Sequence, residues 1–144
     1  MSGSGALYTR EVLALATSLS QWPLDPGLPL SGAARSPTCG SAIALSLATD
    51  QAGAIAKIGL KAQACAIGQA SAAIFAAAAA GRDADNLSAA LAGIRSWLKD
   101  GGELPDWPGL AMIAAARDYP ARHGAITLAW QAALEALSSQ QNPR

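Results

Sequence analysis

Apolar residues alternate with small residues in two runs of the first half of this chain, and a turn separates the runs. The first run extends from Ile43 to Thr49 and the second from Ile55 to Leu60, on either side of residues 50–53. Such alternation is typical of a strand with one buried face, so the two runs predict an antiparallel hairpin. The pattern slips out of phase between Ile55 and Ile58, which predicts a β-bulge in the second strand.

Helical periodicity flanks this hairpin on both sides. Apolar residues recur every three or four positions from Leu7 to Leu19, which predicts an amphipathic helix, and the proline-rich residues 21–35 predict a loop. After the hairpin, small residues and capping signals predict four more helices, with Asp85 or Asn86 as the cap of the second. Glycines and prolines mark their ends, so the first, third and fourth of these helices are predicted at 68–80, 107–117 and 121–137, with a frayed tail after Ser138. The second has Leu87, Leu91, Ile94 and Leu98 on one face and is ended by Gly101 and Gly102.

A hairpin followed by helices indicates an α+β fold. The chain has 144 residues, which suits one domain, so we expect residues 1–144 to form a single unit. Aromatic residues make up only 5% of the chain, while many of its apolar residues are alanine. This composition favours closely packed helices over a core of large aromatic side chains.

Charge and hydropathy exclude several classes of function. The formal net charge is zero, so no long-range field recruits nucleic acid or an anionic membrane. Residues 62–81 carry no charge and are long enough to span a bilayer, but they contain few large apolar side chains and several polar ones. We therefore expect no membrane span, and with no apolar leader at the N-terminus we expect a cytoplasmic protein.

The two cysteines provide the strongest candidate chemistry. Cys39 lies in the turn Pro37-Thr38-Cys39-Gly40, directly before the predicted hairpin, and Cys65 lies directly after it at the start of a helix. The two ends of a hairpin meet, so both sulfurs are expected at the same end of the sheet. Thiolates are ligands of zinc, iron and iron–sulfur clusters. The alternative is two buried, inert cysteines that pack as small hydrophobic residues.

These two contexts resemble the U-type iron–sulfur cluster scaffold family. In that family a Pro-x-Cys-Gly-Asp turn and a cysteine at a strand-to-helix junction hold a metal or cluster, and the segment Ala64–Ser71 resembles the second motif. The resemblance covers the chain from Tyr8 to Leu137 in the order of its elements. It implies an IscU/SufE-like fold, in which about three antiparallel strands are covered on one face by four to five helices. It also places a third strand near residues 32–36.

The chain departs from the family pattern at two ligand positions. Ser41 stands where the family has aspartate, and Gly124 stands where it has a third cysteine. By the same match, His123 precedes the position of that cysteine and is a candidate substitute ligand, since neutral imidazole binds zinc and iron. Arg122 is a candidate neighbour that would lower the pKa of the two thiols. For His123 and Arg122 the alternative is a solvated side chain in the first turn of a helix.

The resemblance implies a scaffold rather than an enzyme. Its site would be Cys39, Cys65 and His123, with Ser41 and Arg122 beside them, and its cofactor would be a transient iron–sulfur cluster or zinc. The implied partners are a cysteine desulfurase and apo iron–sulfur proteins, with a homodimer left open. Two alternatives remain, namely a non-assembling homologue that regulates a desulfurase and a sulfur-transfer protein that uses Cys65.

Overall fold

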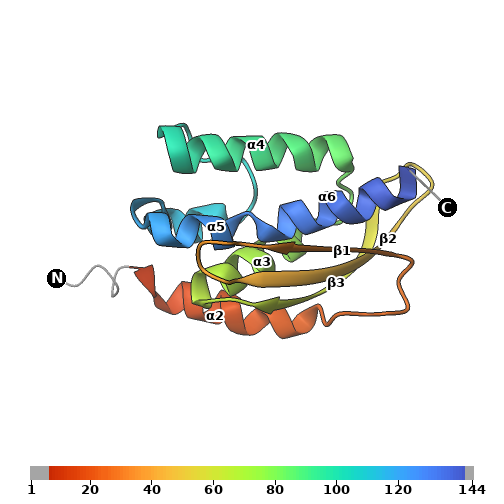
Figure 1. Cartoon of the computed structure of the whole chain (residues 1–144), viewed down its shortest axis with the longest axis horizontal. Coiled ribbons are helices and arrows are strands. Elements are labelled where there is room, and N and C mark those ends of the chain that lie inside the picture. Colours follow the sequence, from red (N-terminus) through yellow and green to blue (C-terminus); the bar gives the residue numbers. More distant parts are fainter. Residues whose placement is uncertain (1–6, 142–144) are drawn as a thin grey trace.

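The computed structural model describes residues 7–141, and its centre is a three-stranded antiparallel sheet. Strands β1 (Leu30–Arg35), β2 (Ala42–Thr49) and β3 (Ile55–Gln63) lie side by side in that order (Figure 1). The predicted hairpin is β2 and β3, and the strand placed near residues 32–36 by resemblance is β1. The predicted bulge is confirmed, because Thr49 pairs with Ile55 and Ala48 with Lys57, which leaves Ala56 unpaired in the register.

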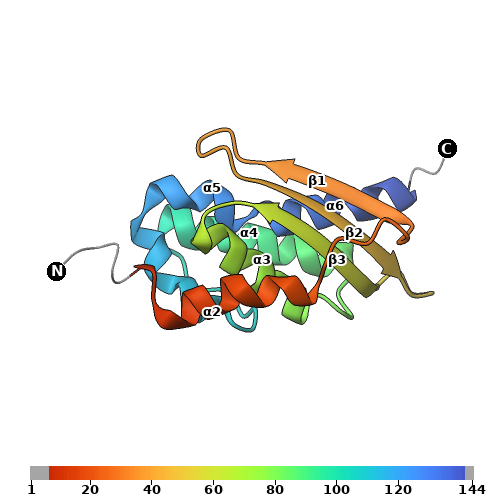
Figure 2. The same cartoon turned by 90° about the horizontal axis from the view of Figure 1, so that it is seen from below.

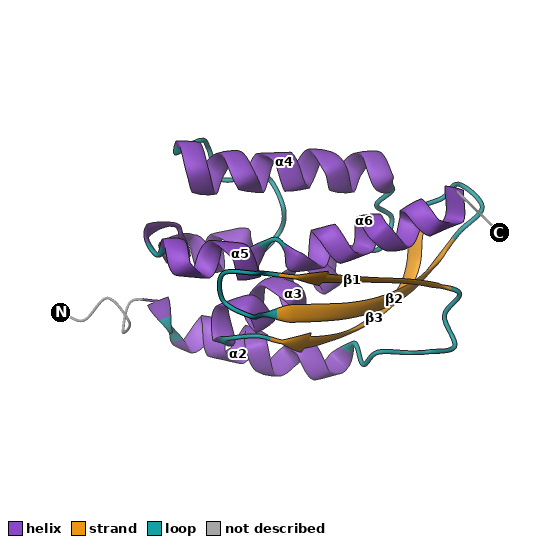
Figure 3. Cartoon of the chain, viewed as in Figure 1, coloured by secondary structure: helices purple, strands orange, loops and turns teal. Residues whose placement is uncertain are grey.

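Five α-helices of the described residues cover the sheet or one another, which confirms the predicted α+β fold. Three 3₁₀ segments connect or extend them. Figure 3 distinguishes the helices from the three strands by colour. The α-helices are α2 (Arg10–Ser18), α3 (Ala66–Ala78), α4 (Ala84–Asp100), α5 (His123–Ile126) and α6 (Leu128–Gln141). The 3₁₀ segments are η1 (Leu19–Gln21), η2 (Leu110–Asp118) and η3 (Pro120–Arg122).

The helices gather on one face of the sheet and leave most of the other face open. Helix α6 packs on β1 and β2, α2 packs along α3, and α4 lies beyond α6 as an outer layer (Figures 1 and 2). Gly32 allows this close approach, since a Cβ there would overlap the carbonyl oxygen of Ala132 in α6. On the open face, a Cβ at Gly59 would overlap the carbonyl oxygen of Pro23, and the Asp25 N–H donates to the Ser46 hydroxyl at 3.2 Å, so the preceding loop crosses β3 and β2 at these residues.

An aromatic cluster joins α3 to the C-terminal half. Phe75 stacks on Trp107 with ring centroids 5.5 Å apart, and Trp130 meets both rings edge-on at 5.2 Å. The Trp107 indole Nε1–H donates to the Ile74 carbonyl at 3.0 Å, which satisfies its polar atom inside the core. The expectation of a core without large aromatic side chains is therefore wrong at this point, since few aromatic residues are present but they gather at the centre.

Three predicted helix boundaries need correction. The cap of α4 is Asp83 rather than Asp85 or Asn86, because the Asp83 carboxylate accepts from the Asn86 backbone N–H at 2.9 Å while the Asn86 side chain accepts from the Asp83 N–H. The predicted helix at 107–117 begins only at Leu110 and is 3₁₀, because Gly109 has φ 88° and Trp107 turns into the core.

The last predicted helix, 121–137, is divided into η3, α5 and α6, and α6 continues to Gln141. The rest of the predicted frayed tail, residues 142–144, lies outside the described residues. Residues 62–81 comprise the end of β3, the junction at Cys65, α3 and the turn that follows α3. Among the described helices none has the length and apolar character needed to cross a bilayer.

Candidate functional site

Cys39 lies in the short connection between β1 and β2. The Ser36 N–H donates to the Ser41 carbonyl at 2.8 Å, and the Gly40 N–H donates to the Ser36 carbonyl at 3.0 Å, so residues 36–41 close into a tight loop. Gly40 takes φ 73°, a conformation in which a residue with a side chain would be strained. The loop therefore holds the Cys39 side chain on the surface, where it is exposed.

Cys65 reaches the same end of the sheet from the other side of the hairpin. It follows β3 and is the N-terminal cap residue of α3, with an extended backbone at φ −65° and ψ 171°. Since Ala42 pairs with Gln63, the loop before β2 and the junction after β3 leave the sheet at one edge. Cys65 is half-buried, and both cysteines are free thiols. This confirms the predicted placement of the two cysteines at one end of the hairpin.

Hydroxyl groups surround the Cys39 sulfur. The Cys39 thiol donates to the Ser41 Oγ at 3.2 Å, and this hydroxyl can donate in turn when the sulfur is ionised. Side-chain hydrogen bonds from Ser36 and then Ser41 are the main causes that lower the pKa of Cys39, and the positive charge of Arg122 adds a smaller effect in the same direction. Ser36 and Ser41 are only 3% and 5% exposed, so the surrounding protein fixes their positions.

The sequence placed Ser41 beside the candidate ligands, as a hydroxyl that more often hydrogen-bonds locally than binds metal, but it gave no indication of Ser36. Ser36 is separated from Cys39 by Pro37 and Thr38, and only the closure of the loop brings it to the sulfur. The predicted proximity of Arg122 to a thiol agrees with the structure for Cys39.

The C-terminal segment returns to the Cys39 loop at Gly124, where the family has its third cysteine. A Cβ built on Gly124 would overlap the Ser36 hydroxyl oxygen and lie 3.2 Å from the Thr38 hydroxyl oxygen. One residue later, Ala125 packs against Gly68 in the first turn of α3. A Cβ built on Gly68 would lie 3.1 Å from the Cβ of Ala125. The space into which a side chain at position 124 would extend is therefore occupied by the Ser36 and Thr38 side chains.

His123 makes a contact of its own. Its Nε2 atom lies 2.7 Å from the Arg117 carbonyl oxygen, so the Nε2–H donates and this nitrogen is not available as a metal ligand while the bond stands. Among the described residues, no three His, Cys, Asp or Glu side chains are grouped closely enough to hold a metal ion. Cys39, Cys65 and His123 therefore do not form a ready site for zinc, and the donor set does not fit a resident metal.

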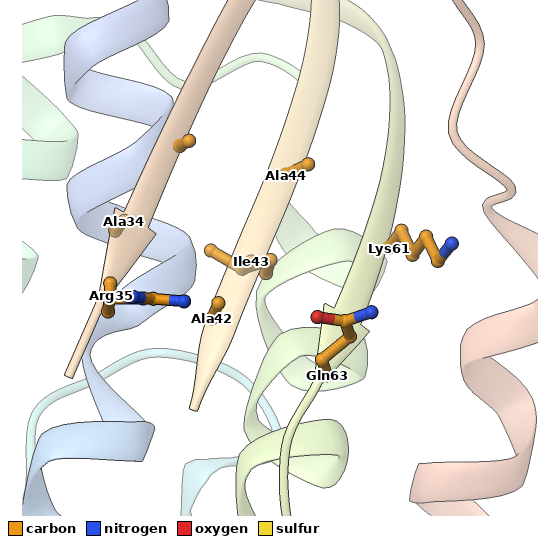
Figure 4. Close-up of a pocket in the computed structure, with 8 residues that line it drawn as sticks. Ala34, Arg35, Ala42, Ile43, Ala44, Lys61 and Gln63 are labelled. Carbon is orange, nitrogen blue, oxygen red and sulfur yellow. The ribbon is translucent and has the colours of Figure 1, made fainter. Parts of the chain in front are cut away.

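A shallow groove continues from the Cys39 loop over the open face of the sheet. Its volume is about 490 Å³, and its lining comes from all three strands (Figure 4). The register places Arg35, Ala42 and Gln63 in one row across the sheet, and Ala33, Ala44 and Lys61 in the next. These residues alternate with buried ones along the strands, and this alternation is a signal for the surface in the sequence. The alternation alone does not show which of the two faces the helices leave open.

Solved structures with the same fold were found. The chain is 25% identical to a nitrogen-fixing NifU-like protein (N-terminal) from Brucella abortus, covering 99% of this chain and 100% of that one with a TM-score of 0.89. A protein from Fervidobacterium islandicum AW-1, assigned as an iron–sulfur cluster assembly scaffold for the SUF system, shares 17% identity and a TM-score of 0.79 over 92% and 97% of the two chains.

A third structure, of a hypothetical protein, is 28% identical with a TM-score of 0.67, covering 88% of this chain and 96% of that one. No protein-family model matches the sequence, and no curated protein matches it. The likeness to the first two structures confirms the predicted resemblance to the U-type scaffolds and the predicted fold.

Proposed function

We propose that this chain, a divergent relative of the U-type scaffolds, is a non-enzymatic carrier that assembles iron and sulfur on Cys39 and Cys65 and holds the product as transient cargo. The observation that carries this proposal is the arrangement of two free thiols at one end of the hairpin, one of them exposed and held among hydroxyl groups. The fold supports it, because its neighbours include a protein assigned as a cluster assembly scaffold.

The ligand set explains why the cargo would be transient. A [2Fe–2S] cluster normally takes four protein ligands, whereas this chain offers two thiolates and a glycine at the third position. A cluster bound here keeps open coordination positions, which a receiving protein or a second copy of the chain can fill. Open positions favour release to an acceptor over permanent storage.

Anaerobic reconstitution tests this function. The wild-type chain, Cys39→Ser and Cys65→Ser would be incubated with ferrous iron and sulfide, desalted, and analysed for iron, acid-labile sulfide and visible absorption. We expect iron and sulfide together in the wild type and a loss of both in each variant. His123→Ala should retain most of the cargo, because His123 and the two cysteines are not grouped as a metal site among the described residues. A wild type that binds neither element under these conditions contradicts the proposal.

Sulfur transfer through Cys39 is a second candidate function. The sequence favoured Cys65 for this role, but Cys39 is the more exposed thiol and its pKa is lowered by Ser36 and Ser41. In this reaction the Cys39 thiolate attacks the outer sulfur of a persulfide donor. A new S–S bond forms on Cys39, the bond within the donor breaks, and the donor cysteine leaves as a thiolate.

Mass spectrometry after exposure to a cysteine desulfurase and free cysteine separates the candidates. A gain of one sulfur atom on Cys39 that persists in Cys65→Ser supports transfer through Cys39. A gain only on Cys65 restores the assignment made from the sequence. Desulfurase binding with no sulfur on either residue and no bound iron would instead favour a regulatory homologue, which does not assemble clusters.

The remaining proposed features follow from the same resemblance. The partners would be a cysteine desulfurase as the sulfur source and apo iron–sulfur proteins as receivers. A homodimer and a cytoplasmic location stay predictions.

A further inference from the structure

The groove beside Cys39 is a surface that the proposed function does not yet use. Small side chains form its floor, since Ala33, Ala42 and Ala44 line it from β1 and β2. Figure 4 shows Ala42 and Ala44 on β2. Alanine side chains leave the sheet nearly flat here, so a second polypeptide can approach the strands closely. Ser36 to Ser41, the loop that holds Cys39, directly joins the two strands that line the groove. The groove therefore reaches the end of the sheet from which the Cys39 loop leaves.

The two charged side chains that line the groove are both basic. The acidic groups nearby belong to other elements, since the Glu135 carboxylate of α6 accepts from the Ala33 N–H at 2.9 Å and Asp25 lies in the loop that crosses Ser46. Arg35 extends over the groove from β1, and Lys61 projects from β3 on its other side (Figure 4). Lys57, two rows further along β3 in the register, is exposed as well. None of the residues in the three strands is acidic. Within residues 7–139, Arg35 and Lys61 form no ion pair or side-chain hydrogen bond, so both charges are available to a ligand.

The two positive charges and the small side chains of the groove indicate which kind of molecule can bind in it. Nucleic acid is disfavoured, because the groove has no aromatic side chain for base stacking and the net charge of the chain is zero. Stacking two copies face to face would bring Arg35 and Lys61 of both copies together, which like-charge repulsion opposes. An acidic segment with small side chains fits both the two cations and the flat floor.

We propose that this groove docks an acidic segment of the protein that delivers sulfur to Cys39. The inference rests on the proposed function, because it assigns the approach route of the sulfur donor to the same site. Arg35 and Lys61 attract the segment and set its position, and the alanine floor lets it lie against the strands. The donor's persulfide then meets Cys39 at the end of the groove, where the transfer described above takes place.

Charge reversal with a matched control tests the docking. Arg35→Glu combined with Lys61→Glu changes the net charge by −4, and so does Arg95→Glu combined with Lys99→Glu on the exposed face of α4, beyond α6 from the sheet. A third variant, Ala44→Phe, fills the groove without changing charge. Binding to a cysteine desulfurase of the source organism would be measured at low and high salt. Sulfur gain on Cys39 would be measured with this desulfurase and, separately, with inorganic polysulfide.

We expect the groove double variant to bind the desulfurase at least about tenfold more weakly at low salt, while the α4 control changes far less. The difference should shrink at high salt because screening weakens exposed charge pairs. Ala44→Phe should also weaken binding. Polysulfide should modify Cys39 equally in all three variants, since a small donor needs no docking surface.

Two results would overturn the docking proposal alone. The first is a groove double variant that binds the desulfurase and accepts its sulfur like the wild type. The second is a wild-type dimer that dissociates when Arg35 and Lys61 are reversed, because the occupant would then be a second copy of the chain. A wild type whose Cys39 accepts sulfur neither from the desulfurase nor from polysulfide would instead contradict the sulfur-acceptor role on which the inference rests.

Discussion

Gly124→Ala is the sharpest structural test of the candidate site, because it adds one methyl group at the family's third ligand position. The new Cβ would overlap the Ser36 hydroxyl oxygen and lie 3.2 Å from both the Ser36 Cβ and the Thr38 hydroxyl oxygen. Ser36 is 3% exposed, and its Oγ lies 3.0 Å from the Thr38 Oγ1 in a hydrogen bond. The hydroxyl therefore cannot turn aside without losing a bond, and the Ser36 Cβ remains close in every rotamer.

Two effects of this substitution oppose each other. Forcing an extra carbon into a packed site costs about 1–3 kcal/mol. Replacing glycine inside a helix returns up to about 1 kcal/mol, and less in a helix as short as α5. We expect Gly124→Ala to lower the free energy of unfolding by about 1 kcal/mol. In a Ser36→Ala background the overlap with the oxygen disappears, so the same substitution should cost about 1 kcal/mol less.

Urea unfolding of the four proteins of this cycle, followed by tryptophan fluorescence, measures the coupling. The reasoning is refuted if the two substitutions add within about 0.5 kcal/mol, since residues in contact should not be independent. It is also refuted if Gly124→Ala stabilises the wild-type background. Either result would mean that the position is open, and that a third ligand is absent for reasons other than space.

Three further predictions follow from single contacts. Ser41→Ala removes a hydroxyl that lowers the pKa of Cys39. In a Cys65→Ser background, where Cys39 is the thiol that is alkylated, the pH midpoint of its reaction with iodoacetamide should therefore move upward. An unchanged midpoint would show that this hydroxyl does not stabilise the thiolate. Because folding lowers the pKa of Cys39, the free energy of unfolding of the wild type, measured relative to Cys39→Ser, should increase as pH rises from the folded-state pKa towards the ordinary value of 9.0. This extra stability should be lost as pH falls through the folded-state pKa, and a flat difference over that range would contradict the shift. Asp83→Ala should lower the unfolding free energy by about 1 kcal/mol because it removes the cap of α4, whereas Asp85→Ala should change it little; equal effects of the two would argue against the assigned cap.

The sequence predicted the sheet better than it predicted the helix ends. Alternation of apolar residues predicted the strands β2 and β3 and the bulge at Ala56, because both depend on which side of the sheet each side chain faces. Strand β1 was located only by the resemblance, since the prolines and glycines of residues 21–35 predicted a loop with at most one short extended piece near its end. The prediction that a helix starts at Trp107 was wrong, because the stacking of the Trp107 ring on Phe75 outweighs the local helix-start signal of Trp107 and Pro108.

For the site, sequence order was enough to bring the two cysteines to one end of a hairpin. It was not enough to place His123, whose bond to the Arg117 carbonyl depends on how η2, η3 and α5 follow one another. It also missed Ser36, because a loop must close before residues three apart meet at one sulfur. The groove was beyond sequence reasoning for a similar reason, since only the packing of α3 and α6 shows which face of the sheet stays open.

Cluster transfer tests the central claim most directly. The chain would be loaded anaerobically with iron and sulfide and mixed with an apo-ferredoxin, and formation of the ferredoxin cluster would be followed by visible circular dichroism in the presence of an iron chelator. We predict that the loaded wild type forms the ferredoxin cluster faster than free iron and sulfide at the same concentrations, and that Cys39→Ser and Cys65→Ser lose this advantage. A wild type no faster than free iron and sulfide, or two variants as fast as the wild type, would contradict the assignment of Cys39 and Cys65 as the residues that carry the cargo.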